Sequence, residues 1–161
     1  HKWPDFEDIF QGFDLVHCAF LSDEEIEKLT NEPRVIRHLK KLHAIRYNAN
    51  YLLEKSETFG SVSDFVLTFP PDKYIELLFE LKANASRLGG MSAQYFLRKL
   101  GVDAFILSRD VVKALTRAQI ITKTPTSKRD LINVQTAFNY WHDESGRSLT
   151  EISRILAMSI D

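Results

Sequence analysis

Two adjacent glycines, Gly89 and Gly90, stand directly before a helical segment, and their spacing suggests chemistry more clearly than any other feature. Residues 91–100 repeat apolar side chains at helical spacing and stop at Gly101. Because glycine has no side chain, the pair lets the backbone turn sharply and lie close against a ligand. The unbonded N–H groups at the start of the next helix then point towards an anion. The pattern predicts a turn between two helices that binds phosphate.

The stretch 87–111 resembles the helix-hairpin-helix DNA glycosylases, and within them the 3-methyladenine DNA glycosylase I family. Two other stretches carry the resemblance. Residues 35–49 resemble that family's pattern of Ile-Arg, then Lys, then Ala-Ile, then Asn-Ala along one long helix, and residues 145–157 look like one branch of it. The resemblance covers nearly the whole chain. It implies an enzyme that removes 3-methyladenine from double-stranded DNA with alkylated bases.

The resemblance also implies that the glycine turn holds a DNA phosphate through backbone N–H groups, with Arg87 or Gln94 adding side-chain contacts. The alternative is a plain turn between helices that needs glycine. The commoner hairpin of the superfamily has the pattern Gly-x-Gly. Residues 87–89 here are Arg-Leu-Gly, so Arg87 replaces the first glycine of that pattern. The expected DNA-binding residues are Arg87, Gly89, Gly90, Met91, Ser92, Gln94, Ser108 and Arg109.

The resemblance places no catalytic carboxylate. Many relatives in the superfamily carry an aspartate near the start of the helix after the connector 102–107, and Ser108 occupies that position here. Asp110 lies two residues further on, about 200° around a helix. The 3-methyladenine family also lacks this aspartate, so we interpret Asp110 as a first-turn acid favoured by the helix dipole. No lysine stands at the lyase position, which implies a simple glycosylase that uses water.

The family's pocket glutamate, stacking aromatic residues and DNA wedge lie largely before the segment that matches Trp3. The chain starts with His1 rather than Met, so either it was processed or an N-terminal piece is missing. The catalytic residues are therefore unknown. Trp3 lies near Phe6 and Phe10 at helical spacing and is interpreted as core, with a position beside the base pocket as the alternative.

No metal and no cofactor are expected. The family often holds a structural zinc through a His and a Cys, and the matching positions here are Asp110 and Ala114. Cys18 is the only cysteine, so it cannot form an internal disulfide, and it has no cluster of zinc ligands around it. His38 and His43 are five residues apart on one helix, which places them on different faces, as surface or polar-network residues.

Charge is distributed unevenly along the chain. Residues 1–81 carry 9 Lys and Arg against 15 Asp and Glu, residues 82–129 carry 10 against 2, and residues 130–161 carry 2 against 5. The central segment is therefore +8 although the whole chain is −1, and it contains the glycine turn. A local basic face attracts a polyanion even when the total charge is near zero. The alternative is a solvated surface that happens to be basic.

The length of 161 residues, 44% of them hydrophobic and 27% charged, predicts one compact domain. No apolar run approaches the roughly 20 residues of a membrane helix, and no signal peptide is recognisable. We expect a monomer located in the cytoplasm, without membrane contact.

Helical periodicity and capping residues predict an all-α fold without strand pairs or internal repeats. Ser22 and Ser148 each precede a Glu by three residues and predict capping boxes. Asp72 is expected to cap the first helix of the helix-hairpin-helix element, which spans residues 72–100. The expected helices are 3–13, 23–30, 34–57, 72–84, 91–100, 108–118, Thr126 or Ser127 to 144, and 148–158, with a turn or short helix at 61–65.

Three hypotheses of function follow. The first is the 3-methyladenine DNA glycosylase of base-excision repair. The second is a non-catalytic DNA-binding module of the same fold that recognises damaged or distorted DNA. The third is a helical protein-interaction domain, which the basic segment 82–129 argues against.

Overall fold

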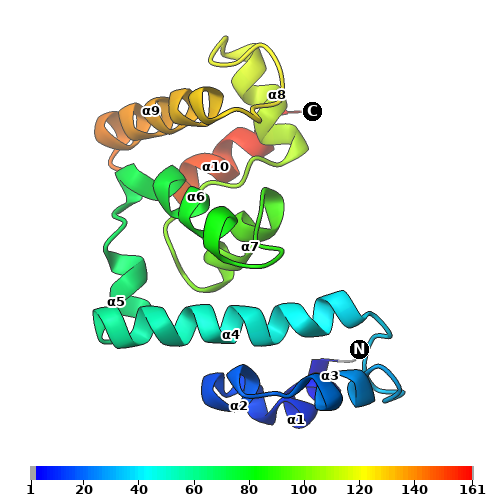
Figure 1. The fold of residues 1–161 in the computed structure, drawn as a ribbon. Helices are drawn as coiled ribbons and strands as arrows, with labels where there is room; N and C mark the ends of the chain where they lie inside the picture. The colour runs from blue at the N-terminus through cyan, green and yellow to red at the C-terminus, as the bar shows by residue number, and fades with distance from the viewer. Residues whose placement is uncertain (1–2, 161) are drawn as a thin grey trace. The chain divides into compact units, whose positions relative to one another are not determined.

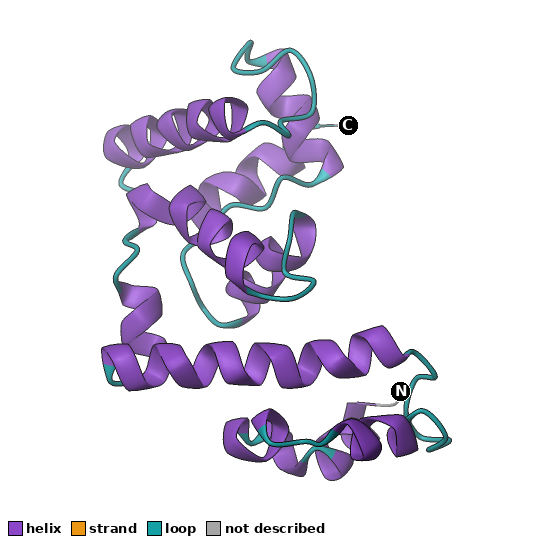
Figure 2. Cartoon of the chain, in the orientation of Figure 1, coloured by secondary structure: helices purple, strands orange, loops and turns teal. Residues whose placement is uncertain are grey.

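The computed structural model describes residues 3–160, and in that range the chain forms helices joined by turns (Figure 1). No strand occurs among these residues (Figure 2), which confirms the all-α prediction. None of the helices there has the length and apolar character that crossing a membrane requires. The α-helices and the 3₁₀ turns (η) are, in order, α1 (Trp3–Ile9), η1 (Gln11–Phe13), α2 (Leu15–Ala19), α3 (Asp23–Leu29), α4 (Leu39–Phe59), α5 (Val62–Leu67), η2 (Pro71–Lys73), α6 (Tyr74–Asn84), α7 (Met91–Lys99), α8 (Arg109–Arg117), α9 (Lys128–Ser145) and α10 (Leu149–Met158).

The chain divides into two compact units. The first unit runs up to Thr68 and also includes Asn84–Arg87. The second unit comprises Phe69–Ala83 and the chain from Leu88 onwards. The expectation of a single domain stays a prediction.

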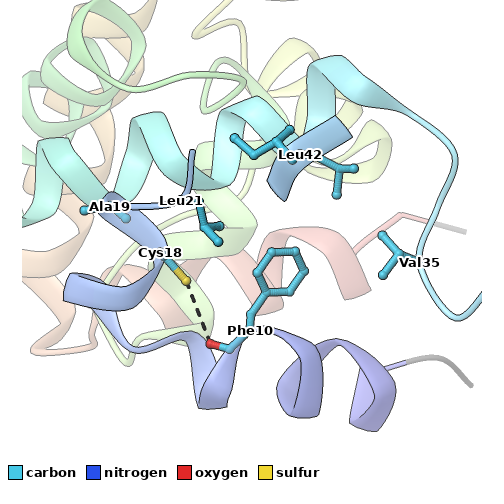
Figure 3. Packing of buried hydrophobic residues seen from close by; sticks show 8 residues of the cluster. Phe10, Cys18, Ala19, Leu21, Val35 and Leu42 are labelled. Atoms are coloured by element: carbon cyan, nitrogen blue, oxygen red, sulfur yellow. Dashed lines mark hydrogen bonds between the residues drawn. The ribbon is translucent and has the colours of Figure 1, made fainter. Parts of the chain in front are cut away.

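A cluster of apolar side chains forms the core of the first unit, in which α2 and α3 pack on the long helix α4. The Cys18 thiol lies inside this cluster and donates a hydrogen bond of 3.9 Å to the Phe10 carbonyl oxygen (Figure 3). Burial raises the pKa of the thiol, so it stays protonated and packs as a small apolar side chain. The buried members of the cluster are Phe10, Cys18, Ala19, Leu21, Ile26, Val35, Leu42 and Ala49.

The first helix is shorter than predicted. α1 ends at Ile9, and Gly12 in the following turn has a left-handed φ of 68°, which an α-helix cannot contain. Trp3 is 62% exposed, its indole N–H donates to the Glu7 carboxylate at 2.7 Å, and its ring stacks on Phe13. The prediction that Trp3 belongs to the core is wrong, because the indole covers Phe13 from outside and bonds a solvated carboxylate.

The longest helix, α4, begins at Leu39 rather than at Arg34. The Glu32 carboxylate accepts hydrogen bonds from both the backbone N–H and the guanidinium of Arg34, at 3.1 and 3.0 Å, and this holds the preceding segment in turns. Val35 is nevertheless buried in the core of the first unit. Val35 thus belongs to the core although the chain there is not helical, whereas the neighbouring Ile36 is 37% exposed.

Serine residues cap the helices much as predicted. Ser22 and Ser148 form complete capping boxes at the starts of α3 and α10. Ser127, and not Thr126, caps α9, because its hydroxyl oxygen accepts a hydrogen bond from the N–H of the third helical residue.

The start of α6 differs from the prediction, because Pro71–Lys73 form a 3₁₀ turn and Asp72 does not cap the helix. The buried side chain of Gln135 on α9 takes over this role. Its amide oxygen accepts from the Ile75 N–H at 3.0 Å, and its NH₂ group donates to the Pro71 carbonyl at 3.1 Å. Two segments of the second unit that lie far apart in sequence are thereby joined.

Three aromatic rings form the centre of the second unit. Phe105 stacks on Phe138 at a centroid distance of 4.2 Å and meets Tyr74 edge-on at 4.9 Å. The Tyr74 hydroxyl is buried and has no hydrogen-bond partner among the residues that the structure describes. Burial also raises the pKa of this phenol far above its usual range, so the hydroxyl stays neutral.

Replacing Tyr74 with phenylalanine is expected to raise the free energy of unfolding by about 1 kcal/mol, because a buried hydroxyl without a partner is costly. Urea denaturation measures the change. Tyr140 is 61% exposed, so Tyr140→Phe serves as the control and should leave stability unchanged. A Tyr74→Phe variant less stable than the parent would show that the hydroxyl does have a partner.

Glu151 is expected to make stability depend on pH in the acid range. Hydrogen bonds from the backbone N–H and the hydroxyl of Ser148, at 2.9 and 3.2 Å, lower the pKa of Glu151 from its ordinary 4.5. A carboxylate with a lowered folded-state pKa stabilises the fold above its unfolded-state pKa, and this contribution is lost as pH falls through the folded-state value. Glu151→Gln should therefore reduce the loss of stability below pH 4.5.

Thermal unfolding between neutral pH and about pH 3 tests this expectation. Asp143→Asn, which changes an exposed carboxylate on α9, is the matched control. If the unfolding temperatures of the parent and of Glu151→Gln fell equally as the pH is lowered, the role given to Glu151 would be contradicted.

Candidate nucleic-acid interface

The glycine turn, residues 88–90, leads into α7 in the second unit. Gly90 is the N-cap residue of α7 and has φ 56° and ψ −128°, a conformation that side chains disfavour strongly. Gly89 has an ordinary φ, and a Cβ built on it would lie 3.9 Å from Lys82 Cγ, which is a normal contact. The sharp turn therefore depends on Gly90, whereas Gly89 only keeps its surface free of a side chain.

Helix α7 begins without a side-chain cap. Its first intrahelical bond runs from the Gln94 N–H to the Gly90 carbonyl, so the N–H groups of Met91, Ser92 and Ala93 have no intrahelical partner. The helices α8, α9 and α10, by contrast, each begin with a serine whose hydroxyl accepts from the first turn. The N–H groups at the start of α7 are therefore available to an anion, which the helix dipole favours.

Gln94 lies on the inner face of α7, where it is only 4% exposed. Its amide oxygen accepts a hydrogen bond of 2.7 Å from the Leu107 N–H. Leu107 directly precedes Ser108, so this bond brings the starts of α7 and α8 together. The Gln94 side chain thus supports the connector 102–107, and it does not lie on the surface where a phosphate contact was expected.

Asp103 anchors the connector to the start of α10. Its two carboxylate oxygens accept from the backbone N–H groups of Leu149 and Thr150, at 3.0 and 2.8 Å. The Thr150 hydroxyl oxygen accepts in turn from the Ala104 N–H at 3.2 Å. Together with the Ser148 cap, these bonds satisfy the first three N–H groups of α10. Sequence reasoning gave Asp103 no role, because its partners follow it by 46 and 47 residues.

Further polar groups of the connector are bonded as well. The Ser153 hydroxyl oxygen accepts from the Ile106 N–H at 3.0 Å, and the Arg98 guanidinium donates to the Ala104 carbonyl. Desolvation lowers the pKa of Arg98, and its Nε is buried without a partner among the described residues. Arg98 is therefore a structural cation of α7 rather than part of an exposed basic surface.

Asp110 lies in the first turn of α8, as expected. Its side chain is 51% exposed and forms an ion pair of 3.5 Å with Lys113. Ser108 is the N-cap residue, and its hydroxyl oxygen accepts from the Val111 N–H at 3.3 Å. Arg109, the first helical residue, is exposed.

Arg87 lies in the first unit and has a left-handed φ of 63°, which is uncommon for a residue other than glycine. The residue before Arg87 is Ser86, and the Asn48 side chain on α4 forms hydrogen bonds with both backbone polar groups of Ser86. Its Oδ1 accepts from the Ser86 N–H at 2.7 Å, and its NH₂ group donates to the Ser86 carbonyl at 3.0 Å. These bonds give Asn48 a structural role that the sequence alone did not reveal. A phosphate contact of Arg87 stays a prediction.

Some of the basic side chains of residues 82–129 interact with other groups of the protein. Arg117 donates to the Ser159 carbonyl at 3.1 Å, and the Lys128 ammonium lies 5.5 Å from the centre of the Phe79 ring. Five other cations of this segment, all in the second unit, are exposed and form no ion pair or hydrogen bond within residues 3–160. They are Lys82, Lys99, Arg109, Lys123 and Arg129.

Among residues 3–160, no group of three or more His, Cys, Asp or Glu side chains is placed to hold a metal ion. At the two positions that match zinc ligands of relatives, Asp110 is paired with Lys113, and Ala114 offers only a buried methyl group. The residues present there do not fit a zinc ion.

Comparison with known proteins supports the resemblance. A family model described as methyladenine glycosylase matches residues 1–100, which include α4, the glycine turn and α7. DNA-3-methyladenine glycosylase 1 of Escherichia coli (strain K12) is 32% identical over 68 residues, or 42% of this chain and 36% of that relative. The match therefore spans little more than a third of the relative's length, and no solved structure matches the chain. Because the family model covers more than half of the sequence, the chain belongs to the methyladenine glycosylase family.

Proposed function

We propose that this protein is a DNA repair glycosylase that hydrolyses the N-glycosidic bond of 3-methyladenine in alkylated double-stranded DNA. The observation that carries the proposal is the family match over residues 1–100, which ends just after the glycine turn and α7. The name of the Escherichia coli relative supports the same base as substrate. Hydrolysis leaves an abasic site, the starting point of base-excision repair.

The proposal assigns the DNA phosphate contact to the start of α7. The N–H groups of Met91 and Ser92 have no intrahelical partner, and the preceding Gly89 and Gly90 leave the turn open to a close approach of the DNA backbone. The exposed cation Lys82, whose Cγ would touch a Cβ at Gly89, adds charge beside the turn. Phosphate contacts of this kind position the protein without reading the base sequence.

The chemistry demands little of the protein beyond binding. A methylated purine is a good leaving group because it already carries positive charge, so binding the extruded base and stabilising modest charge supply most of the rate. Water is the nucleophile. The proposal gives no residue of this chain a catalytic role, because the surface ion pair with Lys113 leaves Asp110 as a helix-start acid.

A second candidate is a DNA-binding module of the same fold without catalysis. The observations in its favour are the open start of α7 and the exposed cations of segment 82–129, which support DNA binding and require no catalysis. Such a module would bind damaged or distorted DNA in a salt-sensitive manner and release no base.

The experiment that separates the two is chromatography of free bases released from methylated duplex DNA by the complete polypeptide. The proposal predicts 3-methyladenine in the soluble fraction. Salt-sensitive binding to the same DNA without any released base would favour the second candidate.

A further inference from the structure

A cavity of about 360 Å³ opens beside the start of α7 in the second unit. Its walls are mainly apolar and come from α6, α9 and the end of the connector, with Leu78, Leu107 and Leu131 as representative contacts. Gly90 and Met91, at the start of α7, also line it. The cavity therefore shares a border with the turn to which the phosphate contact is assigned.

The Gln94 side chain lines this cavity and carries an unused hydrogen-bond donor. Because the Leu107 N–H can only donate, the atom of Gln94 that accepts from it must be the amide oxygen. The NH₂ group then has no hydrogen-bond partner among the residues described, and its nitrogen keeps some access to solvent although only 4% of the residue is exposed. An accessible donor on a nearly buried side chain that lines a cavity selects a ligand that offers it an acceptor atom.

Positive charge and hydroxyl groups complete the lining. Lys82 contributes to the wall near the turn, and Thr124 and Thr126 contribute from the loop before α9. Gly90 and Met91, which line the cavity, also begin α7, whose first N–H groups have no intrahelical partner. The cavity thus combines apolar walls, one unpaired donor and a cationic residue, and it lies beside an anion-binding helix start.

We propose that this cavity binds one nucleoside monophosphate unit, with its base against the apolar walls and its phosphate at the rim. A ring nitrogen or carbonyl oxygen of the base accepts from the Gln94 NH₂ group, and the phosphate meets Lys82 and the N–H groups of α7. A volume of about 360 Å³ lies at the lower end of the range for small-molecule sites, which suits a single nucleotide.

The bound nucleotide comes from one of two sources, either a free nucleotide or the frayed end of a DNA strand. The inference rests on the proposed function only for the phosphate contact at α7. Binding of the base to Gln94 is separate from base excision and is measured without it.

The test follows the side-chain NH₂ signals of Gln94 in ¹⁵N-correlated NMR spectra of the full chain during titration with deoxyadenosine 5′-monophosphate. We expect these signals to shift together with the backbone signals of Gly90 and Met91. Gln94→Glu keeps an oxygen for the Leu107 N–H and removes the donor, so it should weaken nucleotide binding by about tenfold or more. Leu131→Phe, which fills the cavity from α9, should weaken binding independently.

Inorganic phosphate and deoxyadenosine are the matched probes. Shifts confined to the backbone of Gly90–Ser92, equal with phosphate alone and unaffected by either variant, would overturn the cavity proposal while leaving the phosphate contact intact. No response to the nucleotide in a protein that still releases base would overturn the cavity proposal alone.

Two DNA competitors identify the source. Displacement of the nucleotide by a duplex with a one-nucleotide phosphorylated overhang, but not by a duplex with closed ends, supports a strand end. Nucleotide binding that neither duplex displaces supports a free nucleotide.

Discussion

Replacing Gly89 with leucine is expected to weaken binding to duplex DNA by about tenfold or more, while the free energy of unfolding changes by less than about 1 kcal/mol. Gly89 has an ordinary φ, and a Cβ there meets only Lys82 Cγ at 3.9 Å, so the fold accommodates the side chain. Because position 89 lies two residues before Met91, we expect the leucine side chain to hinder the approach of a phosphate to the first N–H groups of α7. Fluorescence anisotropy with labelled duplex DNA measures affinity, and urea denaturation measures stability.

A substitution at Gly90 is expected to change stability as well as DNA affinity, so the substitution at Gly89 separates the two effects better. With φ 56° and ψ −128°, Gly90 tolerates no L-residue without backbone strain, so Gly90→Ala should cost about 1–3 kcal/mol of stability in addition to affinity. Gly146→Ala is the matched control, because Gly146 also has a positive φ, 65°, but lies at the end of α9. It should lower stability and leave DNA binding unchanged. Unaltered affinity in a well-folded Gly89→Leu variant would refute the assignment.

Replacing Asp103 with alanine is expected to lower the free energy of unfolding by about 2–3 kcal/mol, the largest stability effect that we predict for a single side chain on the connector. The carboxylate accepts from the N–H groups of Leu149 and Thr150, and its loss leaves two helix-start donors without a partner. Asp103→Asn retains one acceptor oxygen and should lose about half as much. Urea denaturation of the three proteins gives the comparison.

Asp110→Ala is the matched control for this prediction. Asp110 also lies near a helix start, but it is half exposed and contacts Lys113 at 3.5 Å, so its loss should change stability by less than about 0.5 kcal/mol. Equal effects of Asp103→Ala and Asp110→Ala would mean that the connector is not held by the Asp103 carboxylate.

Local signals in the sequence predicted most of the helices, because their causes lie within a few residues. The capping boxes at Ser22 and Ser148 and the glycine turn before α7 depend only on neighbouring backbone groups. The sharp turn at Gly90 was expected for the same reason, since only glycine adopts its conformation readily.

Two of the wrong predictions concern side chains whose partners are distant in the sequence, and a third concerns the length of α1. Gln135 replaces Asp72 at the start of α6 across about sixty residues, and no local pattern reveals such a partner. Gln94 was expected on the DNA surface because it follows the glycine turn, but its amide is bonded to Leu107 inside the second unit. Trp3 was expected in the core because aromatic residues usually bury, although α1 is too short to cover it.

Binding of a DNA phosphate at the N–H groups that begin α7 is tested most directly by amide NMR of the ¹⁵N-labelled protein with a short duplex. We expect large, salt-sensitive shifts of the Gly90, Met91 and Ser92 signals, with no comparable shift at the serine-capped start of α9. Shifts of equal size at both helix starts, or signals of Gly90–Ser92 that stay in place while DNA binds, would contradict it.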